Sequence, residues 1–186
     1  MRRIPALALL GSLALGGCAG ALQTMTNEYP QTVNTARGSL QNAAAAGPVL
    51  LEVRDNPFSA DVARTLAEAA SATSIGMKVR FTLDRAQAAN PGVRLVVQFS
   101  PAPGTSSAAV CDASRPVSKV DVAGRMTALV AFCDRAQPIL SMAASGARPE
   151  SGDAPVIRNL AEQAMLRMFV SSGDSRESPS DFWPDL

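Results

Sequence analysis

The sequence predicts a two-layer α+β domain in which two helices lie on one face of a largely antiparallel sheet of about five strands. Two observations lead to this class. Several short segments alternate apolar and polar residues, which is the pattern of strands with one buried face, and two longer segments repeat apolar residues at helical spacing. Along residues 48–170 these segments follow one another in the order β-α-β-β-β-β-α.

The predicted domain begins with a strand and a helix. Residues 49–54 place three apolar side chains on one face at a period of two, which is the spacing of a strand. Asp55-Asn56-Pro57 ends this strand, because proline cannot donate a backbone hydrogen bond. Residues 61–76 then repeat apolar side chains at helical spacing, with Asp61 near the positive end of the helix dipole and Gly76 as the terminator.

Four further strands and a second helix complete the predicted domain. The strand segments alternate apolar and polar residues and are joined by turns that contain Pro or Gly; they span residues 78–84, 93–99, 119–134 and 139–144. Residues 100–118 form a long loop, which in a compact domain is usually functional or tied down. The second helix covers residues 155–170 and begins at Pro155, a residue that suits the first turn of a helix.

The N-terminal residues have the three zones of a secretory signal. Two arginines lie near the start, residues 4–15 are almost entirely apolar, and Gly16-Gly17 precedes Cys18. This is the order of a positive segment, an apolar segment and a small-residue cleavage site. The apolar segment is shorter than the about 20 residues that a membrane-spanning helix needs, so we interpret it as a signal peptide.

The residues at the cleavage point resemble the lipobox of bacterial lipoproteins. That motif is Leu-x-Gly/Ala-Cys, and Leu15-Gly16-Gly17-Cys18 matches it at each position. The resemblance implies that residues 1–17 are removed as a lipoprotein signal peptide and that Cys18 carries acyl chains such as palmitate, which form a membrane anchor. Ala19, in place of an Asp, implies the outer membrane, with the domain on its periplasmic face. The alternative is an ordinary secreted protein in which Cys18 occurs by chance.

The segment after the lipobox has the composition of a linker. Residues 18–47 are polar, almost uncharged and rich in Ala, Thr, Asn and Gln. We interpret them as the lipidated cysteine followed by a flexible tether with an average end-to-end distance of roughly 30 Å. The alternative is a short helix over residues 31–46, which Gly38 and several Thr and Asn residues disfavour.

Two further cysteines form an even pair when Cys18 is set aside. Cys111 and Cys133 would lie in an oxidising compartment, where disulfides form and persist. A bridge across a loop of this length contributes about 3 kcal/mol in the chain-entropy model. We therefore favour a Cys111–Cys133 disulfide over two free thiols.

The residue inventory argues against catalysis. The chain contains no histidine, which excludes Ser-His-Asp and Cys-His catalysis and His-ligated zinc. A Ser–Lys pair would need Lys78 or Lys119, which we place on solvated strand faces. Paired carboxylates drawn from Asp112, Asp121 and Asp134 offer the remaining route to hydrolysis, but aspartates at turns are ordinary turn chemistry. We expect the protein not to be an enzyme.

Charge and methionine placement also limit the possible partners. Without the two signal-peptide arginines the chain has 15 basic and 16 acidic residues, and no basic patch is present, so nucleic acid is not an expected partner. Met165 and Met168 have the spacing of a soft-metal pair on the second helix. Methionines on an apolar helix face usually fill the core, however. We expect no metal and no cofactor.

The C-terminal segment differs in composition from the domain. Residues 171–186 are dominated by Ser, Gly, Asp and Glu, which predicts a disordered acidic tail. Phe182, Trp183 and Leu186 are the exceptions, and they are candidate docking residues for a partner protein, although we favour their packing on the domain's own surface.

A hairpin over residues 134–146 followed by a terminal helix is similar to the small periplasmic domains of outer-membrane lipoproteins, including activators of cell-wall synthases and curli-secretion lipoproteins. The anchor, the tether, the small α+β domain and the lack of catalytic residues together predict a non-enzymatic accessory or binding domain that contacts another envelope protein. The alternative function is a carrier that holds a lipid or another apolar ligand between helices and sheet and serves an envelope transporter. A histidine-free hydrolase is a third hypothesis and requires converging carboxylates.

Overall fold

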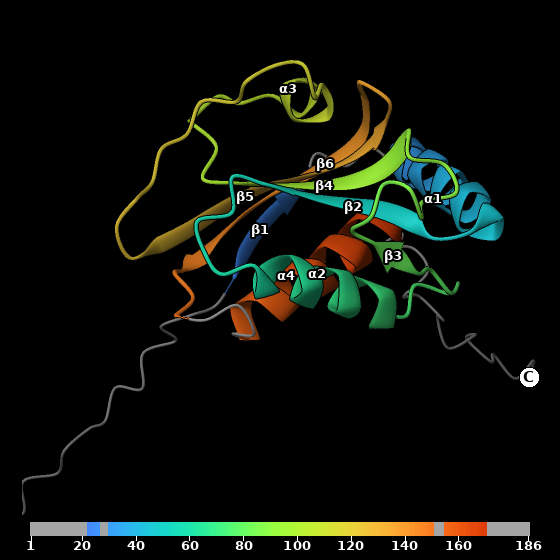
Figure 1. The fold of residues 1–186 in the computed structure, drawn as a ribbon, viewed down its shortest axis with the longest axis horizontal. Helices are drawn as coiled ribbons and strands as arrows, with labels where there is room; N and C mark the ends of the chain where they lie inside the picture. Colours follow the sequence, from blue (N-terminus) through green and yellow to red (C-terminus); the bar gives the residue numbers. More distant parts are fainter. Residues whose placement is uncertain (1–21, 27–29, 151–154, 171–186) are drawn as a thin grey trace, which may run out of the picture.

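The computed structural model describes residues 22–26, 30–150 and 155–170, which form a six-stranded sheet with helices on both faces (Figure 1). Helices α1, α2 and α4 cover one face, here called the inner face, and α3 lies over the opposite, outer face. The elements in chain order are β1 (Gln23–Thr26), α1 (Pro30–Ala46), β2 (Val49–Arg54), α2 (Asp61–Ala72), β3 (Phe81–Thr82), β4 (Val93–Phe99), α3 (Ser107–Cys111), β5 (Arg125–Asp134), β6 (Gln137–Ala147) and α4 (Pro155–Phe169).

The sheet is mixed, with antiparallel pairs in the majority. In the strand order β1-β6-β5-β4-β2-β3, the first four strands pair antiparallel, whereas β2 runs parallel to both β4 and β3. Parallel neighbours need a crossover connection, and α2 provides it on the inner face. The predicted class, an α+β domain with a largely antiparallel sheet and helices packed on it, is confirmed.

The hydrophobic core lies between the inner face of the sheet and helices α1, α2 and α4. Its largest fully buried side chains include Leu40, Leu66, Phe99, Phe132, Leu160 and Phe169. The rings of Phe132 and Phe169 meet edge to face, with centroids 5.1 Å apart. Since Phe132 is close to the end of β5, this contact places the C-terminal end of α4 near the β5–β6 turn.

The segment predicted as a flexible tether belongs to the domain. Within residues 18–47, the structure has strand β1 paired with β6 and the 17-residue helix α1, so the tether interpretation is wrong for residues 23–26 and 30–46, and the alternative helix is the one that forms. Helix α1 buries Val33, Ala36, Leu40 and Ala43 in the core, at successive spacings of three and four residues. This burial outweighs the weak helix propensity of Gly38 and the Thr and Asn residues, because tertiary packing supplies most helical stability in proteins.

The predicted strand over residues 78–84 is nearly absent. Only Phe81–Thr82 pairs, and it runs parallel to the first residues of β2 at the edge of the sheet, so the prediction of an antiparallel strand is wrong. The alternation of Val79 and Phe81 instead reflects side chains that pack against the core from an irregular segment.

Residues around the predicted long loop are also more ordered than expected. The strand predicted from Lys119 begins at Arg125, because residues 118–120 pair with the loop at 100–102. Helix α3 forms within the predicted loop, with the Ser106 hydroxyl accepting a hydrogen bond from the backbone N–H of Ala109. Helix α3 lies on the outer face. On the inner face, α1 joins α2 and α4, so this face carries three helices where two were predicted.

We expect the substitution Leu40→Ala to reduce the free energy of unfolding by about 2–4 kcal/mol, because it leaves a cavity at a fully buried position. Chemical denaturation of the wild-type and variant proteins measures this difference. The neighbouring change Gln41→Ala is the control, since Gln41 is exposed on the same helix and its loss should be nearly neutral. Equal stabilities of the two variants would contradict the packing of α1.

Candidate functional site

The outer face of the sheet concentrates the polar side chains of β2 and β4. Alternation along β4 turns Leu95, Val97 and Phe99 into the core and leaves Arg94 and Gln98 on the outer face. Both polar side chains are nevertheless buried, at 4% and 0% exposure, because α3 and its flanking loops cover them. A buried guanidinium and a buried amide require partners, and those partners define the site.

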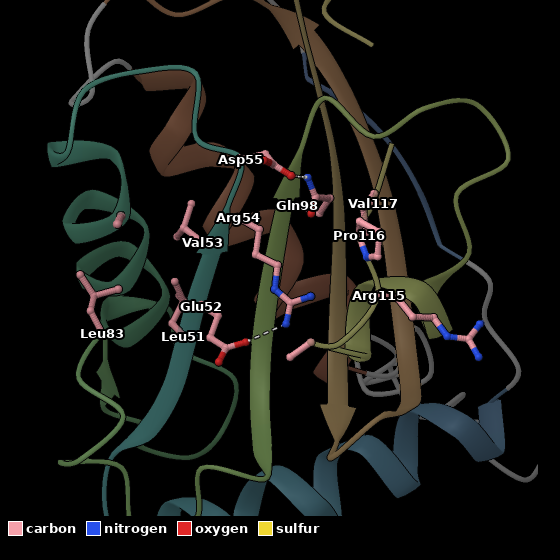
Figure 2. Close-up of a pocket in the computed structure, with 12 residues that line it drawn as sticks. Leu51, Glu52, Val53, Arg54, Asp55, Leu83, Gln98, Arg115, Pro116 and Val117 are labelled. Carbon is pink, nitrogen blue, oxygen red and sulfur yellow. Dashed lines mark hydrogen bonds and ion pairs between the residues drawn. The ribbon is translucent and has the colours of Figure 1, made fainter. Parts of the chain in front are cut away.

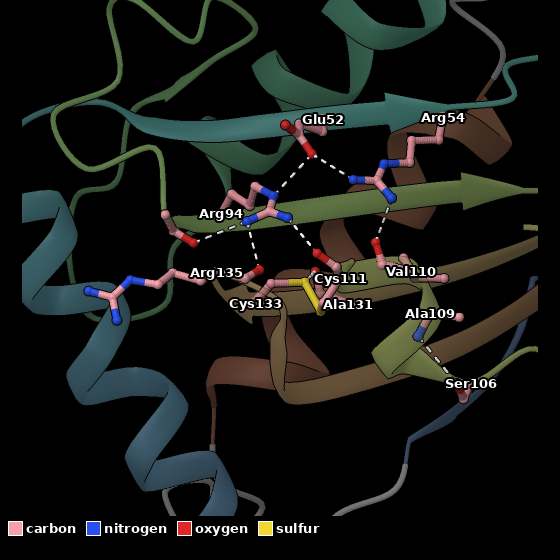
Figure 3. Close-up of a disulfide and its surroundings, with 11 residues drawn as sticks. Glu52, Arg54, Arg94, Ser106, Ala109, Val110, Cys111, Ala131, Cys133 and Arg135 are labelled. Atoms are coloured by element: carbon pink, nitrogen blue, oxygen red, sulfur yellow. Dashed lines mark hydrogen bonds and ion pairs between the residues drawn. A yellow bond between two sulfur atoms is a disulfide. The ribbon is translucent and has the colours of Figure 1, made fainter. Parts of the chain in front are cut away.

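Arg94 connects four segments of the chain (Figure 3). Its Nε donates to Glu52 Oε2 of β2 at 3.0 Å, and Nη2 donates to the carbonyl of Cys111 in α3 at 2.6 Å. Its Nη1 donates to the carbonyls of Gly92 at 3.2 Å and Arg135 at 2.9 Å, which flank β4 and β5. The guanidinium therefore holds α3 and the β5–β6 turn against the outer face.

Arg54 repeats this arrangement one step further along the sheet. Its Nη1 donates to the carbonyl of Val110 at 2.8 Å, and its Nη2 donates to Glu52 Oε2 at 3.2 Å. Arg85 approaches the other carboxylate oxygen, Oε1, at 2.8 Å. Burial by itself raises the pKa of Glu52, but the hydrogen bond from Arg85 and the charge of Arg94 outweigh it, so this pKa lies below its ordinary value.

The disulfide fixes the same helix covalently. Cys111 at the end of α3 is bonded to Cys133 of β5, with their Cα atoms 5.6 Å apart, and the predicted pairing is confirmed. Both cysteines are fully buried and pack with Val96, Val110 and Ala131 in a small second core on the outer face. Helix α3 has only five residues, which is too few for a helix to be stable alone. The disulfide and the contacts from Arg54 and Arg94 therefore hold it in place.

A groove of about 680 Å³ lies beside this clamp (Figure 2). Its floor is the polar face of β2 and β4, and the loop after α3 forms one wall; the lining residues are Leu51, Glu52, Val53, Arg54, Asp55, Ala63, Leu83, Gln98, Ala113, Arg115, Pro116 and Val117. We call it the outer groove. It offers carboxylate, guanidinium and amide groups side by side, which suits a polar ligand or peptide with charges of both signs.

Gln98 and Asp55 lie at one end of the outer groove. The Gln98 Nε2 donates to Asp55 Oδ2 and to the carbonyl of Phe99, both at 2.8 Å. Lys119 approaches the second carboxylate oxygen, Asp55 Oδ1, at 2.7 Å. Burial raises the pKa of Asp55, but the hydrogen bonds from Lys119 and Gln98 outweigh it and leave this pKa below its usual range.

The amide oxygen of Gln98 has no hydrogen-bond partner. Its Oε1 is buried and accepts nothing from the described part of the chain. An unpaired buried acceptor costs about 1–3 kcal/mol. A water molecule or a ligand group with an N–H or O–H would satisfy it only by entering the space around this buried atom.

The structure separates Asp121 from Asp134, and it pairs the third candidate, Asp112, with Arg115 at 3.0 Å. Asp121 precedes β5 and pairs with Arg148, whereas Asp134 is the last residue of the same strand, so the two lie at opposite ends of a ten-residue strand. Met165 and Met168 are fully buried in the core. The Lys119 ammonium group forms an ion pair with Asp55.

The remaining predicted site residues lie outside the described segments. These are the lipidation candidate Cys18 and the docking candidates Phe182, Trp183 and Leu186. Among the described residues, no group of three or more Cys, Asp or Glu side chains is arranged to hold a metal ion. The helices of these same residues are too short or too polar to cross a membrane.

Sequence reasoning missed Arg94 and Gln98. The alternation of residues 93–99 correctly assigns them to the face opposite the core, but an antiparallel strand usually exposes that face to solvent. The available signal was the combination of the predicted disulfide and the 100–118 loop. A loop tied to β5 must cover part of the outer face, and charged residues under it must then be paired.

Comparison of the chain with protein-family models, curated proteins and solved structures found no match in any of the three. The site is therefore interpreted from its own geometry.

We expect Glu52→Gln to lower the free energy of unfolding by roughly 1–3 kcal/mol near neutral pH, because Arg94 stays buried without its ionic partner. The folded pKa of Glu52 lies below the unfolded value of 4.5, so its contribution is complete above that pH and is lost as the pH falls through the folded pKa. Urea unfolding of both proteins across this acidic range measures the effect.

The matched control for this experiment is Glu68→Gln on the exposed side of α2, which should leave stability unchanged at each pH. A stability difference between wild type and Glu52→Gln that stays constant down to the lowest pH would contradict an ionic role for Glu52.

Proposed function

We propose that this chain is a lipid-anchored lipoprotein of the bacterial envelope, held at the periplasmic face of the outer membrane, whose domain is a non-enzymatic accessory module that binds another envelope protein. The observation that carries the proposal is the Leu15-Gly16-Gly17-Cys18 motif ahead of a disulfide-bonded domain. A disulfide is typical of an oxidising compartment such as the periplasm. The two features therefore agree on the compartment.

The outer groove supports the binding role. It combines the charged side chains of Glu52, Arg54 and Arg115 with the unpaired oxygen of Gln98. The Arg115 side chain is 71% exposed and forms an ion pair with Asp112. Because it is exposed, this side chain can turn from Asp112 toward a partner. The groove wall is anchored by the disulfide and by Arg54, so its shape is set before binding.

The course of α4 supports a second contact through the C-terminal segment. Gly146 lies close to both Leu22 and Val156, so α4 begins beside the first described residues. At the last residue of this 15-residue helix, Phe169 packs on Phe132 near the opposite end of the sheet. The segment that carries Phe182, Trp183 and Leu186 therefore continues from the end of the domain remote from the N-terminal anchor.

The alternative function, a carrier of an apolar ligand, has less support. It requires space between helices and sheet, and within the described residues this interface is filled by side chains of 0–1% exposure, including Leu40, Leu66 and Phe99. An apolar groove of about 350 Å³ lies instead on the outer face, between the loop at 101–105 and strands β5 and β6. The accessory role is therefore the preferred proposal.

Replacing Cys18 by Ser should abolish incorporation of a labelled palmitate and move the protein from the membrane to the soluble fraction, because no other thiol is free to be acylated. The double variant Cys111→Ser/Cys133→Ser is the control and should keep both the label and membrane retention. Labelling of the Cys18→Ser variant at the wild-type level would overturn the anchor.

A photoreactive amino acid placed at Ala113, an exposed residue that lines the outer groove, should crosslink to a discrete envelope protein in cells. The same probe at Glu162, exposed on α4 in the opposite layer, is the matched control and should not give this product. The product from Ala113 should fall several-fold when Arg115 is changed to Glu, because the charge at the groove is reversed. Identical products from Ala113 and Glu162 would contradict a binding role for the groove.

A further inference from the structure

The start of β1 and the C-terminal ends of β4 and β6 lie at the same end of the sheet. The backbone N–H of Ser100, just after β4, donates to the carbonyl of Thr127 at 2.9 Å. Thr127 pairs with Ser145 in β6, and Ser145 pairs with Gln23 in β1. These four residues form one row across four neighbouring strands. With a strand spacing of about 4.8 Å, Gln23 lies roughly 15 Å from Ser100 along this row.

The loop over residues 118–124 projects beyond this row (Figure 1). Val120 is held at its base, because its N–H donates to the carbonyl of Ser100 at 2.9 Å. Arg125 begins β5 two residues outside Thr127, and the turn of residues 122–125 lies further out still. The tip therefore extends roughly 7–10 Å past the row, at about 3.3 Å per residue.

Two large apolar side chains of this loop face solvent. Val120 is 44% exposed and Val122 is 43% exposed, and they are two of the four exposed large apolar residues among those that the structure describes. Val120 lies at the base of this loop and Val122 nearer its tip, so both are available to a surface that is held close to this end of the sheet. We call residues 120–122 the valine loop.

Ion pairs on either side hold the valine loop in place. Lys119 is 2.7 Å from Asp55 Oδ1, and Arg148 is 2.7 Å from Asp121 Oδ1. Arg148 also lies over the ring of Phe58, 5.3 Å from its centroid. These contacts fix the loop and pair the charged neighbours of both valines, Lys119 and Asp121, whose side chains are themselves 58% and 57% exposed.

We propose that the valine loop contacts the lipid surface and orients the domain on the membrane. This inference rests on the proposed acylation of Cys18. Five residue steps separate Cys18 from Gln23, and an extended chain covers at most about 17 Å over that number of steps. The row that begins at Gln23 is therefore held within about 17 Å of the membrane, and the valine loop, which projects from the same end, reaches the headgroup region.

The short connection is what selects the membrane as the partner. A separate protein domain would have to occupy the space between this end of the sheet and the bilayer, and that space is narrower than a small domain, which is about 30 Å across. The β5–β6 turn at Ala136 lies at the opposite end of ten-residue strand β5, about 30 Å away, and faces the periplasm in this orientation.

A fluorescence experiment on the full-length acylated protein tests this orientation. With Cys18 acylated and Cys111 bonded to Cys133, the variant Val122→Cys has a single free thiol for an environment-sensitive dye. The protein is reconstituted into vesicles of phosphatidylethanolamine and phosphatidylglycerol with or without a spin-labelled lipid. We expect quenching at position 122 to be at least about threefold stronger than for the matched variant Ala136→Cys, given their separation along β5.

A lengthened connection provides the second variant. Insertion of 20 Gly and Ser residues between Gly20 and Ala21 adds roughly 25 Å of average reach. Quenching at position 122 should then fall to the level of Ala136→Cys, while acylation and vesicle retention are unchanged. Folding of every variant is checked by its unfolding transition.

The outcomes separate this inference from the anchor proposal. Equal quenching at positions 122 and 136, in protein whose Cys18 acylation is verified by intact mass, overturns the orientation and leaves the anchor standing. Persistent strong quenching at position 122 after the insertion also overturns it, because contact would then not depend on the short connection. Absence of acylation, with the protein remaining outside the vesicle fraction, overturns the anchor proposal itself.

Discussion

The buried guanidinium of Arg94 is the constraint on which the outer layer of this protein depends. An unpaired buried charge is strongly destabilising, so each of its N–H groups must find an acceptor. The acceptors come from β2, from α3 and from the residues that flank β4 and β5. Helix α3, which is too short to be stable alone, is thereby fixed at its C-terminal end, where the disulfide to Cys133 closes the same contact covalently.

Strand β4 connects this outer layer to the core. Its inward side chains fill the space beneath α1, α2 and α4, while its outward side chains organise the clamp and the outer groove. The two layers are therefore coupled through one strand, and a groove that rests on β4 has a rigid floor. The hydrogen bonding of Gln98 is incomplete, because its side-chain oxygen is buried and accepts no hydrogen bond from the described residues. Such a group in an otherwise satisfied site indicates a place for a ligand or water.

The ordered N-terminal segment changes the physical relation between the domain and its proposed anchor. A flexible tether of residues 18–47 would let the domain sample a wide volume near the membrane. Because β1 begins at Gln23 and pairs with β6, that freedom is limited to the few residues before it. With the proposed anchor at Cys18, orientation would be a property of the fold, with one end of the domain toward lipid and the other presenting the end of α4.

Features that depend on local pattern could be predicted from the sequence. Alternation assigned the inner faces of β4 and β5, helical spacing located α2 and α4, and the parity of the cysteines predicted the Cys111–Cys133 bond. Three features became apparent only in the folded structure. Residues 30–46 form a core helix, Arg94 is buried, and a groove forms beside α3. The physical reason is that periodicity is encoded within each segment. The burial of a weak helix or of a charged side chain depends instead on contacts with residues distant in the chain, whose placement no local pattern contains.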